Sequence, residues 1–431
     1  MSAHDEGRTW LPPTDHPRLL AAWAETGAAT GFAAHRLRYG PLPQVEGAEL
    51  IDLVARSGLR GRGGAGFPTA RKLRAVADGR GRRTVVANGC EGDPAGAKDG
   101  VLLELAPHLV LDGIVLAARA VGAAEAFLCV HAGSRLVHTL SAVLAGRRSD
   151  EVEVELAEIP RRFVASEETA LVNALTTGDA RPTVSPPRPA RRGVRGRPTL
   201  VDNVETLAHI ALIARHGERW FREAGTRDSP GTTLVTVGGA VALPGVYEID
   251  LGMPVADVLA LAGGATEPLS AIQIGGLGGS WLPLPYACRM PLTHEDARAA
   301  GAALGVAAIV AFPQRACGVA ETARVLRYLA DESAGQCGPC MFGLPAVADD
   351  MAVLAGAADR SGAVLHRLHT RLDVIPGRGA CAHPDGAVRF AAGALRVFAA
   401  DVARHAQGVP CAWATSPSWL PVPGNRREGA R

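Results

Sequence analysis

Residues 58–69 read Gly-Leu-Arg-Gly-Arg-Gly-Gly-Ala-Gly-Phe-Pro-Thr, and five of the first nine are glycine. Residues 61–66 match the G-x-G-x-x-G pattern, which follows a strand in a Rossmann fold. The preceding residues, 48–57, have apolar side chains at helical spacing instead, which excludes the ordinary Rossmann interpretation. Glycines still let the backbone approach a ligand closely, and the start of a following helix favours phosphate. With Arg62 and Lys72 nearby, the stretch predicts a site for a phosphate-bearing cofactor, whereas a structural turn would explain only one or two glycines.

Outward from this stretch, short apolar strands and amphipathic helices alternate as far as residue 216. Such alternation indicates an α/β layer structure. The expected strands are 84–87, 126–130 and 151–156, and the expected helices are 48–57, one opened by Pro68, 101–121, 134–145, 167–175 and 203–216.

The character of the chain changes near residue 230, which predicts further domains. Glycine pairs then separate short strands at 232–237, 245–249, 272–274 and 306–312, with a helix at 254–262, and the pattern is helical from residue 322. The predicted organisation is an irregular arm (1–47), an α/β domain (48–230), a small α+β module (231–315), a helical domain (316–408) and a disordered tail (409–431).

The composition describes a water-soluble protein of several domains. The chain has 431 residues, 47% of them hydrophobic, and a net charge of +2, which does not indicate a nucleic-acid binder. No uninterrupted apolar run reaches about 18 residues, so no direct membrane insertion is expected. The N-terminus lacks the basic and apolar regions of a secretory signal. A cytoplasmic location is the resulting expectation.

Three cysteines predict a metal site. Cys337 and Cys340 form a C-x2-C pair inside Glu-Ser-Ala-Gly-Gln-Cys-Gly-Pro-Cys, and Cys381 follows in Gly-Ala-Cys-Ala-His-Pro. This arrangement favours an iron–sulfur cluster, with structural zinc completed by His383 and packed thiols without metal as the alternatives. A redox dithiol is disfavoured because the pair lies between predicted helices rather than after a strand. Ala334 stands where a C-x2-C-x2-C run would have its first cysteine.

Several polar motifs allow both a functional and a purely structural interpretation. Residues 88–94, Asn-Gly-Cys-Glu-Gly-Asp-Pro, follow a predicted strand, where ligands bind in α/β sheets, but they also suit a plain turn. Glu167 and Glu168 begin a helix, and Asn203 is a possible helix cap, so either can be explained by the helix start alone. The arginine-rich loop at 178–200 is either a solvated surface or a phosphate or partner contact.

These motifs occur in an order that resembles one family. Residues 58–69, the Asn-x-x-Glu-Gly turn, Glu-Glu-Thr-Ala-Leu at 167–171 and Asp-Asn-Val-Glu-Thr at 202–206 are similar to the NADH-binding flavoprotein (51 kDa) subunit of respiratory complex I and related diaphorase subunits. The resemblance covers about residues 48–405. It implies a flavin-binding α/β domain, a ubiquitin-like α+β (SLBB) module and a C-terminal helical bundle with an iron–sulfur site.

The resemblance also implies an activity and its residues. The family passes electrons from NADH through FMN to an iron–sulfur cluster and on to a protein acceptor, as an NADH:acceptor oxidoreductase. Glu91 and Glu168 would be catalytic, and Cys337, Cys340 and Cys381 would bind the cluster. The implied cofactor-binding residues are Gly61, Arg62, Gly63, Gly64, Phe67, Lys72, Asn88, Glu91, Asp93, Glu167, Glu168 and Asn203.

The chain departs from the family pattern at several positions, of which three bear most on function. Ala334 replaces a cluster cysteine, which implies a [4Fe–4S] cluster with an incomplete cysteine set or a [3Fe–4S] cluster. Ala75 and Arg188 replace aromatic residues that stack on the nicotinamide nucleotide in the family. Two rivals follow: a flavin/iron–sulfur protein with another donor such as ferredoxin, or a degenerate non-catalytic binding protein. The implied partner is a small iron–sulfur acceptor protein or a thioredoxin-like [2Fe–2S] subunit.

Overall fold

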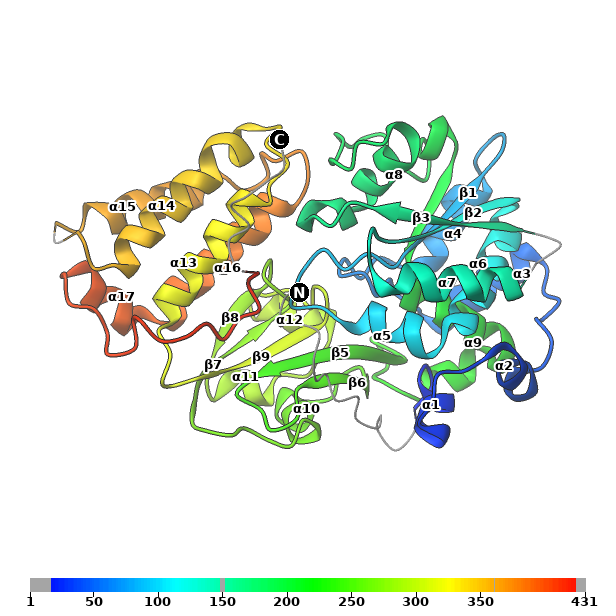
Figure 1. The fold of residues 1–431 in the computed structure, drawn as a ribbon, viewed down its shortest axis with the longest axis horizontal. Coiled ribbons are helices and arrows are strands. Elements are labelled where there is room, and N and C mark those ends of the chain that lie inside the picture. Colours follow the sequence, from blue (N-terminus) through cyan, green and yellow to red (C-terminus); the bar gives the residue numbers. More distant parts are fainter. Residues whose placement is uncertain (1–16, 148–151, 360, 424–431) are drawn as a thin grey trace.

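A computed structural model describes residues 17–147, 152–359 and 361–423. Figure 1 shows three parts: a sheet layered with helices, a second sheet with small helices, and a bundle of helices. The predicted fold class, an α/β domain followed by an α+β module and a helical bundle, is confirmed.

The first sheet is wholly parallel and has the strand order β3-β2-β1-β4. Its strands are β1 (Thr84–Asn88), β2 (Glu125–His131), β3 (Glu153–Ile159) and β4 (Thr199–Asn203). Strand β4 lies partly within the stretch expected to be a loop, because its five residues are too few to show a period after the proline- and arginine-rich residues before them.

Helices cover both faces of this sheet, as parallel sheets require. The larger core lies on the face covered by α3 (Gly47–Ser57), α4 (Thr69–Ala77), α5 (Lys98–Leu105), α6 (Pro107–Val121), α7 (Arg135–Gly146) and α9 (Val204–Arg222). A smaller core lies on the other face, under η1 (Phe163–Ser166), α8 (Glu168–Thr177) and η2 (Val194–Gly196).

One expected helix is two helices. The prediction of a single helix over 101–121 is wrong, because α5 and α6 meet at Pro107 with a bend of 97°. Proline has no N–H to donate and disfavours helical backbone at the residue before it, so the chain turns at Ala106. No single described helix is long and apolar enough to cross a membrane, although this bent pair meets the length and composition criteria when taken together.

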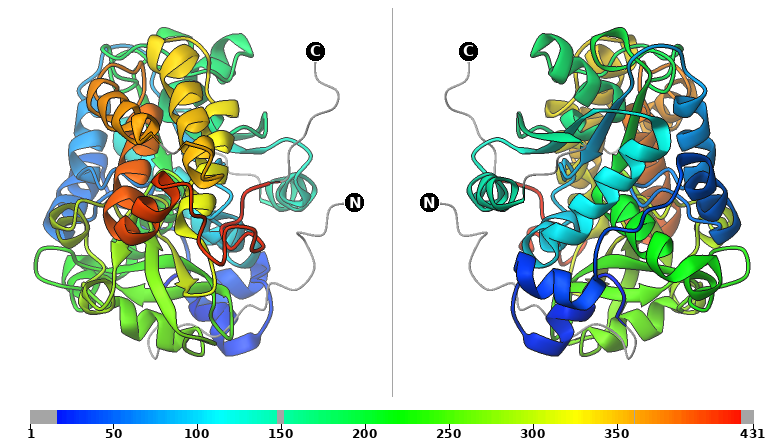
Figure 2. Two further views of the ribbon diagram at one scale, coloured as in Figure 1. Left: turned by 90° about the vertical axis from the view of Figure 1, so that its left-hand side faces the viewer. Right: turned by 90° about the vertical axis from the view of Figure 1, so that its right-hand side faces the viewer.

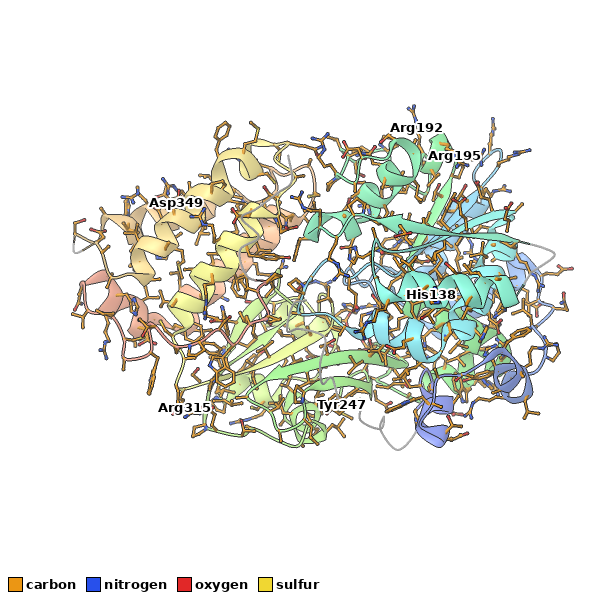
Figure 3. All side chains as sticks on the ribbon, in the orientation of Figure 1. His138, Arg192, Arg195, Tyr247, Arg315 and Asp349 are labelled. Atoms are coloured by element: carbon orange, nitrogen blue, oxygen red, sulfur yellow. The ribbon has the colours of Figure 1, made fainter. Side chains whose placement is uncertain are left out.

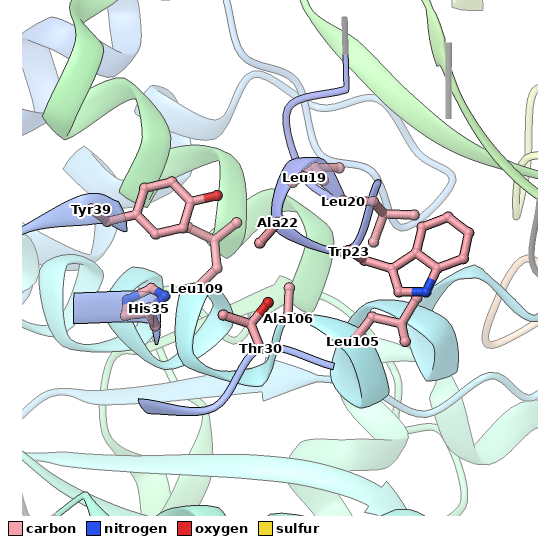
Figure 4. A pocket seen from close by; sticks show the side chains of 10 residues that line it. All are labelled: Leu19, Leu20, Ala22, Trp23, Thr30, His35, Tyr39, Leu105, Ala106 and Leu109. Carbon is pink, nitrogen blue, oxygen red and sulfur yellow. The ribbon is translucent and has the colours of Figure 1, made fainter. Parts of the chain in front are cut away.

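The N-terminal arm is more regular than the sequence predicts. Within its described part lie α1 (Ala21–Thr26) and α2 (Phe32–Tyr39), while residues 1–16 fall outside the described chain. Figure 4 shows Trp23 and Tyr39 of the arm around an apolar space closed by α5 and α6, which is too narrow for a water molecule. This space is therefore a packing feature rather than a ligand site.

The second sheet has the order β6-β5-β9-β7-β8 and matches the expected α+β module. Its strands are β5 (Thr232–Gly239), β6 (Gly245–Asp250), β7 (Leu269–Ile274), β8 (Ser280–Pro283) and β9 (Ala308–Pro313). The accompanying helices are α10 (Val255–Leu261), α11 (Tyr286–Arg289) and α12 (His294–Ala299).

The remaining helices form the bundle that faces the viewer in the left view of Figure 2. They are α13 (Gly318–Asp331), η3 (Pro339–Gly343), α14 (Leu344–Ala355), α15 (Ala363–Val374), α16 (His383–Val397) and α17 (Ala399–Ala406). Residues 409–423 then lie against the bundle with Cys411 and Leu420 buried, which differs from the disordered tail expected there. Burial of these two side chains supplies the packing that the polar composition of the segment does not suggest.

Candidate functional site

The site is defined by the point where the order of the parallel strands reverses. Strand β1 has β2 on one side and β4 on the other, and Asn88 and Asn203 are paired in register as their last residues. Ligands of open α/β sheets bind outside the carboxyl ends of the strands at such a switch point. The two asparagines therefore mark where a cofactor is expected.

The glycine-rich loop lies over this switch point. Its ends are closed by the Gly61 N–H, which donates to the Phe67 carbonyl at 2.9 Å. The backbone N–H of Arg62 donates to the Thr206 hydroxyl at 2.8 Å, which fixes the loop to the first turn of α9. At Gly63 a Cβ atom would lie 3.2 Å from the Cβ of Asn203, so the loop backbone touches the strand end directly.

Lys72 supplies the positive charge at the same edge. Its Nζ donates to the Val201 carbonyl at 2.6 Å and lies 3.4 Å from Asp202 Oδ1 and 3.6 Å from Glu168 Oε2. Burial alone would lower the pKa of Lys72, but the carboxylates of Asp202 and Glu168 outweigh it and raise the pKa. The ammonium is therefore held in the charged form beside the strand ends.

A buried network of charged side chains lies beside the switch point. The Lys98 ammonium donates to Asp99 at 2.6 Å and to Glu205 at 2.8 Å, and Asn203 Nδ2 donates to Asp99 at 2.7 Å. Burial alone would raise the pKa of Glu205, but the charge of Lys98 helps to lower it to about 2. These charges are paired and hydrogen-bonded, as buried charges must be, and they orient Asn203.

Glu91 and Asp93 both lie beyond β1, but their oxygens bind backbone groups. Glu91 accepts from the Asp99 and Gly100 N–H groups at 3.0 and 3.1 Å, at the start of α5. Asp93 accepts from the Leu277 N–H at 2.7 Å and so joins the sheet domain to the second sheet. Burial raises the pKa of Glu91 to about 7 and that of Asp93 to about 6. Both carboxylates thus hold backbone segments in place through hydrogen bonds. Their roles toward a flavin stay predictions.

The two glutamates at the start of α8 have different surroundings. Glu167 is the helix cap, and its Oε2 accepts from the Thr169 and Ala170 N–H groups at 2.8 and 3.1 Å. Glu168 extends instead toward Lys72. The purely structural interpretation therefore describes the contacts of Glu167, whereas Glu168 faces the predicted site.

The two positions where this chain lacks the aromatic residues of the family pattern, 75 and 188, lie in one cleft. Ala75 and Arg188 line a cleft of about 600 Å³ together with Pro186, Pro187, Ala190 and Arg191. Arg195 and Arg197 of the same loop instead bind Glu125 at 2.9 Å each, at the start of β2, and Arg192 and Arg195 are labelled in Figure 3. Two arginines of this loop, Arg195 and Arg197, thus form structural ion pairs, whereas Arg188 and Arg191 line the cleft.

Of the three predicted cluster cysteines, Cys337 and Cys340 lie between α13 and α14, and Cys381 lies between α15 and α16. Cys340 is buried within η3, a single turn of π-helix, and such turns are frequent at functional sites. Burial raises the pKa of Cys340 to about 12, with the Cys337 and Cys381 sulfurs adding to the effect. Burial also acts on Cys337, but backbone hydrogen bonds at Ala380 and Cys340 outweigh it and lower its pKa. The thiols of Cys337 and Cys340 are hydrogen-bonded and both interact electrostatically with Cys381, which suits a shared metal centre.

A short segment joins the switch point to the cysteines. Asn88 Nδ2 donates to the Ser166 carbonyl at 2.9 Å, and the Phe163 ring lies 5.1 Å from the His383 ring. The Phe163 N–H also donates to Glu332 at 2.9 Å, next to the loop that leads to Cys337. Residues 163–167 therefore contact Asn88 at the switch point, and His383 and Glu332 on the segments that carry the cysteines.

Two sets of residues were not singled out from the sequence as a site. Asp99 and Glu205 both accept from Lys98, and only the fold brings Glu205 to this lysine. Cys317, His405 and Cys411 come together in the bundle from distant positions, and no sequence spacing signals this.

A parallel sheet with a glycine-rich loop at its switch point, connected through residues 163–167 to the helices that carry three cysteines, defines a class of cofactor-dependent redox proteins. Three family models match the chain: the Nuo51 FMN-binding domain over residues 54–212, the SLBB domain over 234–280, and the NADH-ubiquinone oxidoreductase-F iron-sulfur binding region over 320–405. All three lie in the order that the sequence predicts.

Whole-chain comparisons agree with these matches. The chain is 33% identical to the NADH-quinone oxidoreductase F subunit of Streptomyces coelicolor, over 94% of each chain, and 31% identical to that of Escherichia coli, over 81% and 82%. Its structure is similar to the air-oxidized NAD+-reducing [NiFe]-hydrogenase, with a TM-score of 0.80 and 32% identity over 94% of this chain and 69% of that one. The chain belongs to the family of NADH-quinone oxidoreductase F subunits.

Proposed function

We propose that this chain takes electrons from NADH, passes them through FMN to an iron–sulfur cluster, and delivers them to a protein acceptor. The observation that carries the proposal is the segment 163–167, which contacts Asn88 at the switch point and His383 beside Cys381. Electron transfer between two cofactors requires that their sites adjoin. The names of the relatives, which are oxidoreductases of NADH or NAD+, support the same reaction.

The residues at the switch point fit FMN. Gly63 lies directly against Asn203, and the glycines at 61, 63 and 64 carry no side chain that would keep a ligand from the loop backbone. The buried Asp202 Oδ2 has no hydrogen-bond partner among the described residues, and Arg62 Nε has only an ion pair with Glu205 at 3.9 Å, which suits a site completed by a polar ligand. Arg62 and Lys72 add two positive charges, which favour a phosphate.

We assign the predicted roles as follows. Gly61, Gly63 and Gly64 would admit the flavin, Arg62 and Lys72 would hold its phosphate, and Asn88 and Asn203 would orient it at the strand ends. FMN, when bound, accepts two electrons as hydride and releases them singly. Glu168 would position Lys72, and Glu91 would hold α5 and the Asp99–Asn203 network beside the site. Phe67, which is 41% exposed, would offer the one retained aromatic surface to the nucleotide.

The cysteine group fits a cluster held by three thiolates. Ala334 has no donor atom, so a fourth ligand must come from elsewhere. His383 Nε2 lies 2.7 Å from the Leu329 carbonyl, and because a carbonyl only accepts, this nitrogen carries the proton. Its Nδ1 then has a free lone pair, is buried and has no partner among the described residues. We therefore assign His383 as the fourth ligand of a [4Fe–4S] cluster, with the [3Fe–4S] form as the alternative.

The acceptor would dock beside the cysteines. Met341 and Phe342 directly follow Cys340 and are 52% and 70% exposed. Large exposed apolar side chains beside a redox centre suit a protein partner. A small iron–sulfur protein or a thioredoxin-like [2Fe–2S] subunit would take the electron there, and the relatives are named as subunits of oxidoreductases.

An anaerobic titration of FMN-reconstituted protein with NADH tests the flavin step. Stoichiometric loss of flavin absorbance is expected. Gly63→Val should abolish it by preventing FMN binding, whereas Gly146→Val should not, because a Cβ at Gly146 meets nothing within 4 Å. If NADH leaves the flavin oxidised while dithionite reduces it, the donor is another molecule such as ferredoxin.

Iron and sulfide content with electron paramagnetic resonance tests the cluster. Four irons per chain and a signal altered by His383→Ala are expected, because loss of the imidazole changes the ligand set of one iron. Three irons with no change in His383→Ala would assign the [3Fe–4S] form instead. Protein without iron or sulfide after anaerobic reconstitution would favour the non-catalytic binding protein.

A further inference from the structure

A second cluster of metal-binding side chains lies in the helical bundle, apart from the three cysteines above. It consists of Cys317, His405 and Cys411, whose ligand atoms all lie within 4.8 Å of one another. All three are buried, and His405 is completely inaccessible. Two sulfurs and an imidazole this close together match the ligands of a single ion.

The imidazole of His405 is held in the form that binds metals. Its Nδ1 lies 3.2 and 3.0 Å from the carbonyl oxygens of Leu354 and Ala355, so Nδ1 carries the proton. Nε2 therefore has its lone pair free to accept, and it lies 3.7 Å from Cys317 Sγ. Carbonyl groups that fix the remote nitrogen in this way are typical of histidines that bind metals. Nε2 accepts the Cys411 N–H at 3.0 Å.

The sulfur of Cys317 also lies at the start of a helix. Cys317 caps α13, a helix of 14 residues, and its sulfur accepts the Ala320 N–H at 3.3 Å. The N–H groups at the start of α13 therefore face this sulfur and favour negative charge on it once a metal is bound.

This cluster is distinct from the predicted iron–sulfur site. Cys317 precedes α13 and Cys337 follows it, so the helix separates the two by about 20 Å at 1.5 Å per residue. The two groups therefore cannot share a metal centre.

We propose that Cys317, His405 and Cys411 bind one zinc ion that fastens the C-terminal segment to the bundle. Two thiolates and one imidazole select zinc among common divalent ions, because zinc accepts soft ligands in tetrahedral geometry. Binding replaces the Cys411 N–H bond at Nε2 and releases the two thiol protons to solvent. A water molecule takes the fourth position.

The contacts around the cluster show what the ion would hold in place. Residues 409–423 pass from Cys411 back along α13, where the Ser418 hydroxyl and the Trp419 N–H each donate to Glu321 Oε1 at 3.0 Å. Glu321 lies in the first turn of α13, next to Cys317. The segment is thus attached to the same helix end twice, once through Glu321 and once through the proposed ion.

Metal analysis of the full-length protein tests the proposal. We expect about one zinc per chain, lost in Cys317→Ser and in Cys411→Ser and kept in Cys288→Ser, which changes a thiol outside both groups. Cys337→Ser should lose iron and keep zinc. Replacement of zinc by Co²⁺ should give intense sulfur-to-cobalt absorption and the visible bands of a tetrahedral site.

A proteolysis measurement on the wild-type protein tests the proposal even if the cysteine variants fail to fold. Chelation of wild-type protein should speed cleavage within 409–423 at least several-fold, and added Zn²⁺ should reverse the effect. Wild-type protein that binds no more Zn²⁺ or Co²⁺ than the double variant Cys317→Ser/Cys411→Ser would overturn the proposal. A Cys317–Cys411 disulfide found by peptide mapping under non-reducing conditions would overturn it as well.

Discussion

The ring of Phe163 lies 5.1 Å from the ring of His383, and this contact joins the parallel sheet domain to the bundle beside Cys381. The same Phe163 ring lies 6.2 Å from Tyr328 on α13. Because Phe163 and Ser166 belong to one short turn, and Ser166 binds Asn88, movement of this turn would change both predicted cofactor sites together.

Phe163→Ala should therefore slow electron transfer between the two cofactors without slowing flavin reduction. Each lost aromatic contact is worth about 0.5–1.5 kcal/mol, so the joint between the domains loosens. Stopped-flow spectroscopy should show flavin reduced by NADH at the wild-type rate and the cluster reduced several-fold more slowly. Phe32→Ala, which removes an aromatic side chain from the N-terminal arm, is the matched control and should change neither rate.

Lys72→Met should weaken FMN binding and destabilise the sheet domain. The change leaves the Val201 carbonyl and the buried carboxylate of Asp202 without their cation. A lost hydrogen bond to a charged group costs about 1.5–3 kcal/mol, which corresponds to roughly a tenfold or greater rise in the dissociation constant for FMN.

Fluorescence titration with FMN measures this loss. Arg74→Met on the same helix is the control, because its ion pair with Asp52 is exposed and contributes little. Wild-type affinity in Lys72→Met would remove Lys72 from the flavin site.

Much of the fold follows from local patterns in the sequence. The helix over 48–57 and the strand that ends at Asn88 were predicted within a residue or so, because apolar periodicity and turn residues are local properties. The break at Pro107 also has a local cause, which the apolar run around it concealed. Strand β4 depends on its place beside β1 rather than on its own five residues.

The sites were less predictable because they are assembled by tertiary packing. Position 72 carries a signal through its charge, but only the fold shows that its partners are Asp202 and Glu168. Cys317 and His405 are 88 residues apart, and nothing in their spacing indicates contact. The capping role of Glu167 was one of two interpretations, and the geometry of α8 supports it.

Asp93→Asn should change how stability depends on pH. Burial raises the pKa of Asp93 from 3.8 to about 6, so the folded protein binds this proton more tightly than the unfolded chain. The proton therefore stabilises the fold fully below about pH 4, and this stabilisation disappears as the pH rises to about 6.

Asparagine does not titrate, so the stability of Asp93→Asn relative to wild type should improve with rising pH. A shift of about two pH units corresponds to about 3 kcal/mol between pH 4 and 7. Urea unfolding of both proteins at equal cofactor loading measures the difference. A stability gap that stays constant over this range would show that Asp93 has an ordinary pKa.

Arg188→Phe should strengthen NADH binding. Arg188 and Ala75 line the same cleft, and neither offers an aromatic face to an adenine ring there. A phenyl ring at 188 would add one stacking contact of about 0.5–1.5 kcal/mol, which lowers the dissociation constant for NADH roughly two- to tenfold. Arg188→Ala separates this effect from loss of charge, and Arg192→Phe places the same ring outside the residues that line the cleft. Calorimetric titration should show tighter binding in Arg188→Phe alone. Tighter binding in Arg188→Ala would mean that the guanidinium repels or blocks the nucleotide. Equal binding in all four proteins would place the adenine outside this cleft.

NADPH belongs in the same titrations, because Arg191 also lines the cleft and remains in every variant. A wild-type preference for NADPH that Arg188→Phe reverses would show that Arg188 and Arg191 together bind a phosphate on the nucleotide.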